Sequence, residues 1–390
     1  MRRRFRVAQI VTRFMAGAGG VALRGGLALN PLDYEVVFLI GQGDRLADEA
    51  RSAGFEVNLI ECLRPDISLL NDRRALRRLS EYLLGNHFDV VHTHSAKAGG
   101  VGRLAARRAG VQRIVHTYHG FPFHDFQSKA RRAAYIRIER ALGRITDSAL
   151  AVGPGVAAEA IRRRLVSPEK VRTIGVGVPA GQVPTCADRA EARRLLGIPP
   201  GMIVVGTVGR LDYQKAPEIF IESLHRLRRK DVFGVWIGDG PLREKARRLV
   251  VRYRLEDQFL FAGERSDVAS VLPGLDVFAM ASRYEGLPCA VLEAMSAARP
   301  IVATAVNAVP DVVVAGETGL LVPPEDANLL SDAIGYLITN PCVADRFGSA
   351  ARVRALAEMG PQNLGEVLDA TYRDSARAAE QAAALEAVTW

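Results

Sequence analysis

The sequence lacks the features that mark several classes of protein. No apolar run reaches the ~18 residues of a membrane-spanning helix, and no apolar segment of signal-peptide length follows the arginine-rich start. The four cysteines lie far apart without a C-x-x-C pair, so neither a zinc site nor a disulfide framework is predicted. We interpret them as buried apolar residues in a reducing compartment, and we expect the protein in the cytoplasm.

Aromatic residues are also scarce, at 6% of 390 residues, and no nucleic-acid-binding motif is present, so we expect no nucleic-acid partner. The positive charge keeps nucleic acid as a remote alternative. Residues 1–180 contain 29 basic and 16 acidic side chains, a net charge of +13, whereas residues 181–390 contain 23 and 27, a net charge of −4. A cationic first half is typical of proteins that meet anionic lipid or a phosphorylated substrate.

Apolar runs of strand length alternate with amphipathic segments of helical period, and this rhythm occurs twice. Such alternation predicts the α/β class, with doubly wound parallel sheets covered on both faces. We expect a basic N-terminal domain over 1–180, a Gly/Pro-rich linker over 181–200, a second domain over 201–365 and a C-terminal helix over 366–390. The predicted strands are Phe5–Val11, Val36–Ile40, Val57–Ile60, Val90–His94, Ile114–Tyr118, Leu150–Val152, Val171–Val178, Ile203–Val208, Phe233–Ile237, Phe259–Phe261, Val277–Met280, Ile301–Ala305 and Leu320–Val322.

Two glutamates, Glu285 and Glu293, follow the predicted strand Val277–Met280. If a helix begins near Pro288, Glu293 returns to the carboxyl end of that strand, where a carboxylate can accept two hydrogen bonds from a ribose diol. The backbone N–H groups of Gly286-Leu287 would lie at the start of that helix, where anions and sugar hydroxyls bind. The alternative is a purely structural pair, one surface glutamate and one helix-capping glutamate.

Two cations, Arg210 and Lys215, follow the first strand of the second domain on a loop. The planar fork of donors of Arg210 and the mobile charge of Lys215 together suit a diphosphate. The order of residues is not that of a P-loop. Solvated loop cations are the alternative.

Four of the seven histidines lie on two predicted strands or directly after them, namely His92, His94, His116 and His119. They have neither the i,i+4 spacing nor the neighbouring Cys or Glu of a zinc site, so we expect no metal. We favour one functional imidazole, His119, at a strand end, with the other three packing within the strands or supporting it.

A glycine-rich segment follows the first strand. Gly17, Gly19 and Ala22 match the dinucleotide fingerprint, so an NAD-dependent oxidoreductase is an alternative. The acidic residue that should close the second strand and hold the ribose is missing, because Asp44 comes only after Gly41-Gln42-Gly43. The glycines still predict a close approach of a ligand to the backbone.

Residues 128–145 form a basic amphipathic pattern, with apolar residues at helical spacing and five arginines between them. Such a helix either docks on anionic lipid or packs in a domain with a solvated basic face. We leave both interpretations open.

Taken in order along the chain, these motifs resemble those of the family-4 retaining glycosyltransferases of the GT-B fold. The resemblance covers nearly the whole chain and is strongest over 203–325. It implies two Rossmann-like domains that face a cleft, with a C-terminal helix that packs back on the N-terminal domain. It rests on Gly19-Gly20, His119-Gly120, Arg210 with Lys215, Gly238-Asp239-Gly240-Pro241, Glu285 with Glu293, and Gly316-Glu317-Thr318-Gly319.

The resemblance implies a nucleotide-sugar donor held mainly by the second domain. Glu293 would bind the ribose, and Glu285 would lie beside the transferred sugar with Gly286 and Leu287. Arg210 and Lys215 would neutralise the leaving diphosphate in place of a metal ion, which makes metal and cofactor unnecessary. Glu264 and Arg265 would lie near the base, for which uridine is favoured.

In the first domain, the resemblance implies that Gly19-Gly20 approaches the distal phosphate and that His119 contacts the donor sugar near the reacting carbon. His92–Gly99 and His119–His124 are similar to enzymes that build bacterial surface polysaccharides on polyprenyl-diphosphate lipids. We therefore expect a lipid-linked acceptor and a peripheral position on the inner face of the membrane. The alternative acceptor is a soluble small molecule of an antibiotic or thiol-cofactor pathway.

Overall fold

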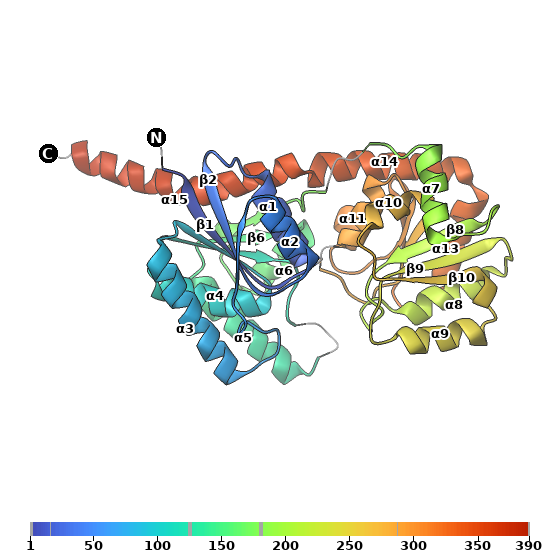
Figure 1. Cartoon of the computed structure of the whole chain (residues 1–390), viewed down its shortest axis with the longest axis horizontal. Helices are drawn as coiled ribbons and strands as arrows, with labels where there is room; N and C mark the ends of the chain where they lie inside the picture. The colour runs from blue at the N-terminus through green and yellow to red at the C-terminus, as the bar shows by residue number, and fades with distance from the viewer. Residues whose placement is uncertain (1–2, 16, 124–126, 179–181, 287, 389–390) are drawn as a thin grey trace. The chain divides into compact units, whose positions relative to one another are not determined.

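The computed structural model describes residues 3–15, 17–123, 127–178, 182–286 and 288–388, with side chains as far as Asp374. The chain divides into two compact units (Figure 1). Unit 1 consists of residues 1–177 together with residues 361–390, and unit 2 of residues 178–360. Both units have the predicted α/β architecture, a parallel sheet with helices packed against it.

Unit 1 is built on seven parallel strands in the order β3-β2-β1-β4-β5-β6-β7. They are β1 (Phe5–Phe14), β2 (Tyr34–Gly43), β3 (Glu56–Leu59), β4 (Val90–His94), β5 (Arg113–Tyr118), β6 (Ser148–Ala151) and β7 (Val171–Thr173). Its helices are α1 (Ala18–Ala28), α2 (Arg45–Ser52), α3 (Leu69–Asn86), α4 (Ala96–Arg108), α5 (Lys129–Arg144), α6 (Pro154–Arg162) and α15 (Pro361–Val388), with the short 3-10 helix η1 (Pro168–Lys170).

Unit 2 is built on six parallel strands in the order β10-β9-β8-β11-β12-β13. They are β8 (Ile203–Val208), β9 (Val232–Ile237), β10 (Phe259–Gly263), β11 (Val277–Met280), β12 (Ile301–Thr304) and β13 (Gly319–Val322). Its helices are α7 (Cys186–Leu196), α8 (Pro217–Leu227), α9 (Arg243–Arg252), α10 (Val268–Val271), α11 (Cys289–Ser296), α12 (Val309–Val312), α13 (Ala327–Thr339) and α14 (Pro341–Met359), with the 3-10 helices η2 (Glu256–Gln258) and η3 (Leu272–Gly274).

Each sheet reverses its strand order once, between β1 and β4 in unit 1 and between β8 and β11 in unit 2. In open parallel sheets, ligands bind at such a switch point, beyond the carboxyl ends of the two strands. The loops after β1 and β4, and those after β8 and β11, are therefore the first places to look for a site. They carry most of the residues that the sequence singles out.

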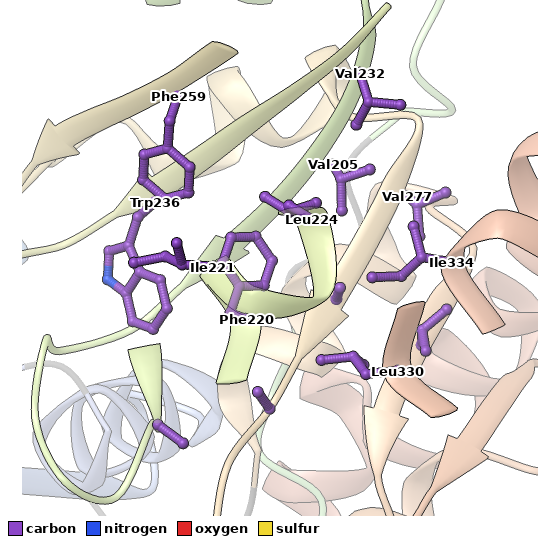
Figure 2. Close-up of a cluster of buried hydrophobic side chains, with 14 of the residues drawn as sticks. Val205, Phe220, Ile221, Leu224, Val232, Trp236, Phe259, Val277, Leu330 and Ile334 are labelled. Atoms are coloured by element: carbon purple, nitrogen blue, oxygen red, sulfur yellow. The ribbon is translucent and has the colours of Figure 1, made fainter. Parts of the chain in front are cut away.

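The core of unit 2 lies between its sheet and the helices α8 and α13 (Figure 2). Phe220 of α8 packs edge-on against Trp236 of β9, with ring centroids 5.6 Å apart. The centroid of the Phe259 ring on β10 lies 6.2 Å from that of Phe220. Since the central strands β8, β9 and β11 are buried on both faces, their sequences are continuous apolar runs rather than alternating patterns. This explains why these strands are visible in the sequence.

The C-terminal helix α15 belongs to unit 1, as the resemblance implied (Figure 1). Its Leu368 is buried against Gly25 of α1. Tyr372, one turn later, has no exposed surface and reaches Gln9 of β1 and His92 of β4. The helix thus closes the core of unit 1, and it begins at Pro361, five residues before the predicted boundary.

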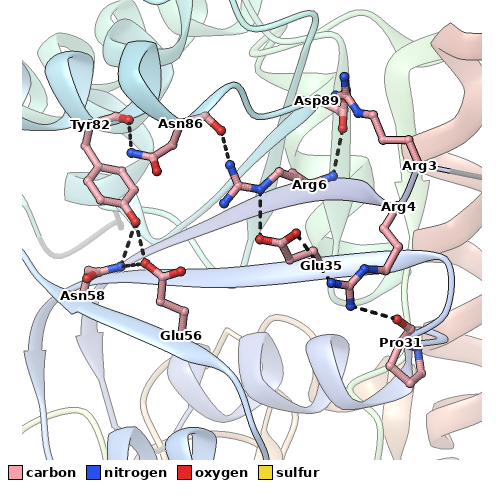
Figure 3. A network of polar contacts seen from close by, with 10 residues as sticks. All are labelled: Arg3, Arg4, Arg6, Pro31, Glu35, Glu56, Asn58, Tyr82, Asn86 and Asp89. Atoms are coloured by element: carbon pink, nitrogen blue, oxygen red, sulfur yellow. Dashed lines mark hydrogen bonds and ion pairs between the residues drawn. The ribbon is translucent and has the colours of Figure 1, made fainter.

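The arginine-rich start of the chain is held by acidic side chains (Figure 3). Arg3 lies 2.5 Å from a carboxylate oxygen of Asp89, and the Arg6 Nε donates to Glu35 of β2 at 2.9 Å. Arg4 lies 3.8 Å from the other oxygen of Glu35. These ion pairs connect β1 to β2 and to the turn before β4. The three arginines therefore add less to a free cationic surface than their number indicates.

The structure also differs from the sequence analysis in the expected linker, in the last strand of unit 1 and in the cysteines. The segment 181–200, expected as a linker, contains α7, whose Thr185 and Asp188 form a reciprocal capping box. Strand β7 ends at Thr173 instead of Val178, and Gly177 beyond it has a left-handed φ of 65°. The prediction that the cysteines are buried was wrong, since Cys186 and Cys342 are exposed and Cys62 and Cys289 are half-buried.

No helix in the described part of the chain combines the length and the apolar character that crossing a bilayer requires.

Candidate active site

In unit 2, Glu285 is the centre of a hydrogen-bonded cluster beyond the carboxyl ends of β8 and β11. Its side chain is only 4% exposed, and its Oε1 lies 2.5 Å from the Lys215 Nζ. The Ser282 hydroxyl donates to the same oxygen at 2.6 Å, and the Gln214 amide donates to Oε2 at 3.3 Å. The two loops at the switch point thus meet through one buried carboxylate and one ammonium group.

The backbone around Glu285 is fixed by the next strand of the sheet. The Glu285 N–H donates to Oδ1 of Asn307, at 3.0 Å, and Asn307 follows β12. The Thr304 hydroxyl at the end of β12 donates to the Ser282 carbonyl at 2.6 Å. Three neighbouring strands therefore determine the position of this carboxylate.

Arg210 lies on the same loop as Lys215, and Asp212 connects the two residues. The Arg210 Nε donates to Asp212 Oδ2 at 2.9 Å, while the Lys215 backbone N–H donates to Asp212 Oδ1 at 3.1 Å. The Arg210 side chain is 60% exposed and that of Lys215 is 18% exposed. The predicted pair of cations is thus brought onto one loop, each with donors still available.

The glycines of the Gly238-Asp239-Gly240 motif let the loop after β9 lie against the loop after β8. A Cβ atom on Gly238 would lie 2.2 Å from the carbonyl oxygen of Gly209, and the φ of Gly238 is 131°. The Trp236 indole donates to that same carbonyl at 2.8 Å. Leu211 donates from its backbone to Asp239. The motif therefore supports the backbone that carries Arg210.

Arg283, next to Glu285, is a structural residue that the sequence analysis did not single out. Its guanidinium donates to the Tyr213 carbonyl at 2.8 Å, to Glu218 at 2.9 Å and to Glu325 at 2.8 Å. It also lies over the Tyr213 ring, 4.2 Å from the centroid. These contacts hold the Lys215 loop against the Glu285 loop.

The remaining predicted residues of unit 2 lie at the same edge of the sheet. The helix α11 begins at Cys289, as predicted, so the half-buried Glu293 lies just over one turn into it. Gly286 is half-buried, and Leu287 lies outside the described residues. Glu264 and Arg265 follow the edge strand β10, roughly 14 Å from β11 at the usual strand spacing. Only an extended ligand can contact both ends.

Glu264 is exposed, whereas Arg265 is engaged by Asp267 through two hydrogen bonds of 2.8 and 2.6 Å. This bidentate pair leaves fewer guanidinium donors for a ligand. Among the predicted residues of unit 2, Lys215 and Glu285 are in direct contact, and Asp212 links Arg210 to the backbone of Lys215.

In unit 1, the glycines after β1 allow a close approach of the helix α1 to the strand. A Cβ on Gly19 would lie 3.0 Å from backbone atoms of Phe14. A Cβ on Gly20 would lie 3.1 Å from a guanidinium nitrogen of Arg24. Arg24 was not predicted, and its position beside Gly20 places a cation at the carboxyl edge of this sheet. Its Nε donates to the Val176 carbonyl at 2.6 Å.

His119 directly follows β5 and is connected to the core by a chain of hydrogen bonds. Its Nε2 lies 2.9 Å from His94 Nδ1, and His94 Nε2 lies 2.5 Å from Gln9 Oε1. The Gln9 amide nitrogen donates to the Tyr372 hydroxyl at 3.1 Å, which lies 2.6 Å from His92 Nδ1. His116 makes a separate contact of 2.9 Å with the Thr93 hydroxyl. Of the other three histidines, His94 contacts His119 directly, whereas His92 and His116 are buried in the sheet with other partners. His124 lies outside the described residues.

This chain of hydrogen bonds determines the tautomer of His119. Burial lowers the pKa of His94 well below its ordinary value, so its ring is neutral. An amide oxygen only accepts, so His94 donates from Nε2 to Gln9 and accepts at Nδ1. His119 must then donate from Nε2. Burial, assisted by the nearby Arg24, lowers the pKa of His119 to about 3, which leaves its Nδ1 as a hydrogen-bond acceptor.

Several residues of the cluster carried no signal in the sequence. Ser282, Gln214 and Asn307 act on Glu285 from three different loops, and Asp212 lies between two predicted cations. Arg24 is a helix residue two positions beyond the glycine fingerprint. A polar residue shortly after a buried strand indicates a position at the carboxyl edge of the sheet. This signal could have identified Ser282 and Asn307, whose residue types alone do not indicate catalysis.

Two family models match the chain. The model described as Glycosyltransferase Family 4 matches residues 15–182, and the model described as Glycosyl transferases group 1 matches residues 188–354. Together they cover the loops of both units described above.

Relatives of known function give the same family. An Escherichia coli UDP-Gal:alpha-D-GlcNAc-diphosphoundecaprenol alpha-1,3-galactosyltransferase is 32% identical over 62% of this chain. The match spans 64% of that relative, just under two thirds of its length. A D-inositol 3-phosphate glycosyltransferase of Saccharomonospora viridis is 30% identical over 77% of this chain and 73% of its own length.

Among solved structures, Anabaena HepE in complex with UDP and glucose matches 95% of this chain and 100% of that chain, with a TM-score of 0.84 and 18% identity. A sucrose-phosphate synthase from Thermosynechococcus elongatus matches 96% of this chain and 100% of that chain, with a TM-score of 0.82 and 24% identity. At these identities the matches establish the fold, two Rossmann-like units of the GT-B type. With the family models and the curated relatives, they place this chain in the family-4 glycosyltransferases of the GT-B fold.

Proposed function

We propose that the protein transfers a sugar, with retention of its anomeric configuration, from a UDP-sugar to a sugar linked to polyprenyl diphosphate. The reaction needs no metal ion and takes place at the cytoplasmic face of the membrane. The observation that carries the donor half of this proposal is the cluster of Lys215, Glu285 and Arg210 at the switch point of unit 2.

The donors that remain on the two cations support a role in stabilising the leaving group. Further negative charge develops on the already anionic diphosphate as the glycosidic bond breaks, and fixed cations stabilise this transition state more than the ground state. Lys215 gives one contact to Glu285 and keeps two N–H donors, and Arg210 keeps its terminal nitrogens. Asp212 acts as a positioning residue for both.

Carboxylates on either side of these cations suit the hydroxyl groups of a nucleotide sugar. Glu285 Oε2 has a single contact of 3.3 Å and retains acceptor capacity for a hydroxyl of the transferred sugar. Glu293, on α11, would accept from the ribose hydroxyls, with Gly286 beside the diphosphate. The base would extend toward Glu264 and Arg265 at the edge strand.

In unit 1, His119 and the loop with Gly19 and Gly20 supply the complementary groups. The neutral His119 accepts a hydrogen bond at Nδ1, which suits a donor-sugar hydroxyl near the reacting carbon. Arg24, beside Gly20, adds a positive charge for the distal phosphate. The acceptor would bind to unit 1.

The acceptor is proposed from the Escherichia coli relative, whose name states a GlcNAc-diphosphoundecaprenol acceptor and UDP-Gal as the donor. The net charge of +13 over residues 1–180 suits the diphosphate of such a lipid and an anionic membrane.

The test is a panel of UDP-, GDP- and ADP-sugars incubated with the purified protein and a synthetic GlcNAc-diphosphate-lipid. Release of nucleotide and the mass of the product identify the donor, and the anomeric configuration from NMR identifies the stereochemistry. Transfer from a UDP-sugar with retention supports the proposal. Inversion, or transfer only from another nucleotide sugar, would contradict it.

A soluble acceptor is the second candidate, because the Saccharomonospora viridis relative is named for D-inositol 3-phosphate and aligns over more of this chain. The same panel with inositol phosphates and aminoglycosides as acceptors separates the two. Transfer to these acceptors, with none to the lipid-linked sugar, would favour the second candidate.

A further inference from the structure

A cavity of about 810 Å³ lies in unit 1 at the edge of the sheet opposite to His119. It is formed by the end of α5, the end of α6 and the turn that leads into β7. These segments precede the amino ends of β6 and β7, whereas His119 follows the carboxyl end of β5. Because all strands of the sheet are parallel, the cavity and the histidine lie at opposite edges.

Four cations line this cavity, namely Arg140, Arg144, Arg164 and Lys170. No carboxylate lies among its lining residues. Glu169 belongs to the same turn but is fully exposed and does not line the cavity. The cavity is therefore strongly electropositive, and an anionic group is its complementary ligand.

Two of these cations are held in place by backbone carbonyls. The Arg140 Nε donates to the Arg163 carbonyl at 2.8 Å, and the Lys170 Nζ donates to the Thr146 carbonyl at 2.8 Å. Both retain further N–H donors, and neither contact neutralises a charge. The positions of the cations are thus set by the fold rather than by ion pairs.

A second cavity of about 570 Å³ lies next to the first, and Ile161 lines both. It follows the edge strand β7 between α6 and α15. Its walls are mostly apolar, and Arg172, Thr173 and Glu366 complete them. A basic cavity beside a largely apolar groove fits a molecule with a phosphate at one end and a hydrocarbon chain at the other.

We infer that these two cavities bind an anionic glycerophospholipid of the membrane, with its phosphate among the four cations and the first part of an acyl chain along β7. This site deepens the membrane association proposed above. Its occupant is not a substrate of the reaction, because it lies at the sheet edge away from His119 and Gly19. The site would anchor unit 1 on the bilayer.

The test measures binding of the full chain to vesicles of phosphatidylglycerol and phosphatidylcholine by co-sedimentation. The variant Arg144→Glu/Arg164→Glu reverses two charges of the cavity. A basic side chain at an anionic membrane strengthens binding about five-fold, so the loss of two, with two carboxylates in their place, should weaken it at least about 30-fold. The control Arg248→Glu/Arg252→Glu makes the same change of net charge on exposed α9 of unit 2 and should keep wild-type binding.

A second variant, Ile161→Asn, leaves all four cations and tests the groove. Weaker vesicle binding is expected, while competition by inorganic phosphate stays as in the wild type. Equal binding of wild type and the double cavity variant would overturn the inference, as would equal losses in variant and control. Binding of inorganic phosphate without vesicle binding, or unchanged vesicle binding in Ile161→Asn, would overturn the assignment to a lipid.

Hydrolysis of UDP-sugar in buffer without vesicles separates this inference from the proposed function. The cavity variants should hydrolyse the donor at the wild-type rate. If neither the wild type nor the variants hydrolyse any nucleotide sugar, the proposed function fails. The co-sedimentation with vesicles still decides whether the lipid site exists.

Discussion

Lys215 and Glu285 come from the two strands that flank the switch point of unit 2, and their charged atoms lie 2.5 Å apart. The contact joins a half-buried ammonium group to a buried carboxylate that three strands hold in place. A cation so fixed needs no reorganisation when charge develops beside it, and this preorganisation is the basis of electrostatic catalysis.

The first prediction concerns Lys215→Ala. It removes a fixed cation while the backbone contact of residue 215 to Asp212 can persist, so transfer should fall about 100- to 1,000-fold in kcat. The control is Lys245→Ala on the exposed face of α9, which should keep full activity.

Glu293→Ala should raise the KM for the nucleotide sugar. Full activity of both Lys215→Ala and Glu293→Ala would refute the site.

The second prediction is that metal removal leaves transfer unchanged. In the proposed function, Arg210 and Lys215 would provide the positive charge that a divalent ion supplies in other transferases. Rates measured with a chelator and with added Mg²⁺ should therefore agree. A rate that disappears with the chelator and returns with Mg²⁺ would show that these side chains are not sufficient.

The third prediction concerns stability and pH. Burial lowers the pKa of His92 to about 3, against about 6.5 in the unfolded chain. Between these values the unfolded chain binds a proton that the folded chain does not, so the free energy of unfolding decreases as pH falls from about 6.5 toward 3. His92 contributes up to about 1.4 kcal/mol per pH unit.

Denaturant unfolding of wild type and His92→Gln between pH 4 and 7 checks this slope. The variant should lose stability less steeply as the pH falls, whatever its stability at pH 7. Identical slopes would mean that the His92 ring titrates normally in the folded protein.

The fourth prediction concerns the buried ion pair between Arg103 of α4 and Glu139 of α5. The atoms lie 2.8 Å apart, and the side chains are 0% and 4% exposed. Glu139→Ala leaves Arg103 buried and uncompensated, which should cost about 3–5 kcal/mol of unfolding free energy. Glu81→Ala, in an exposed pair with Arg77 on α3, should cost less than about 1 kcal/mol. Similar costs for both variants in denaturant titrations would contradict the prediction.

The fifth prediction concerns the tautomer of His119. Long-range ¹H–¹⁵N NMR spectra of the wild type should show the proton on Nε2. Gln9→Leu removes the acceptor that orients His94, so both tautomers of His119 should become populated. A proton on Nδ1 in the wild type would reverse the direction of the whole hydrogen-bond chain.

Much of the fold was predictable because the central strands of both sheets are buried on both faces. Val90–His94, Ile203–Val208 and Val277–Met280 were predicted with the bounds that the structure has. The helix α7 was not predicted, because Pro184 and Pro199 at its flanks dominate the pattern while its capping box is only four residues long. The cysteines were misjudged because Cys186, Cys289 and Cys342 lie in the first turns of helices, near the surface.

The candidate site was predictable only where chemistry and position coincide in one segment. Glu285, Arg210 and Lys215 each follow a strand, so their position at the sheet edge was visible. The residues that hold them in place lie on other loops, as Asn307 does for Glu285. A local sequence pattern does not predict such a partner. Tyr372 lies 280 residues from His92, and no sequence pattern predicted the contact between the two side chains.

The return of α15 to unit 1 has a consequence for biosynthesis. Gln9 and His92 are translated early, but the Tyr372 hydroxyl that pairs with both emerges only after all of unit 2 has been made. On the ribosome, the chain of unit 2 is therefore complete before the chain of unit 1, although the synthesis of unit 1 starts first. The Gln9 amide nitrogen and His92 Nδ1 lack this hydrogen-bond partner until the final helix docks.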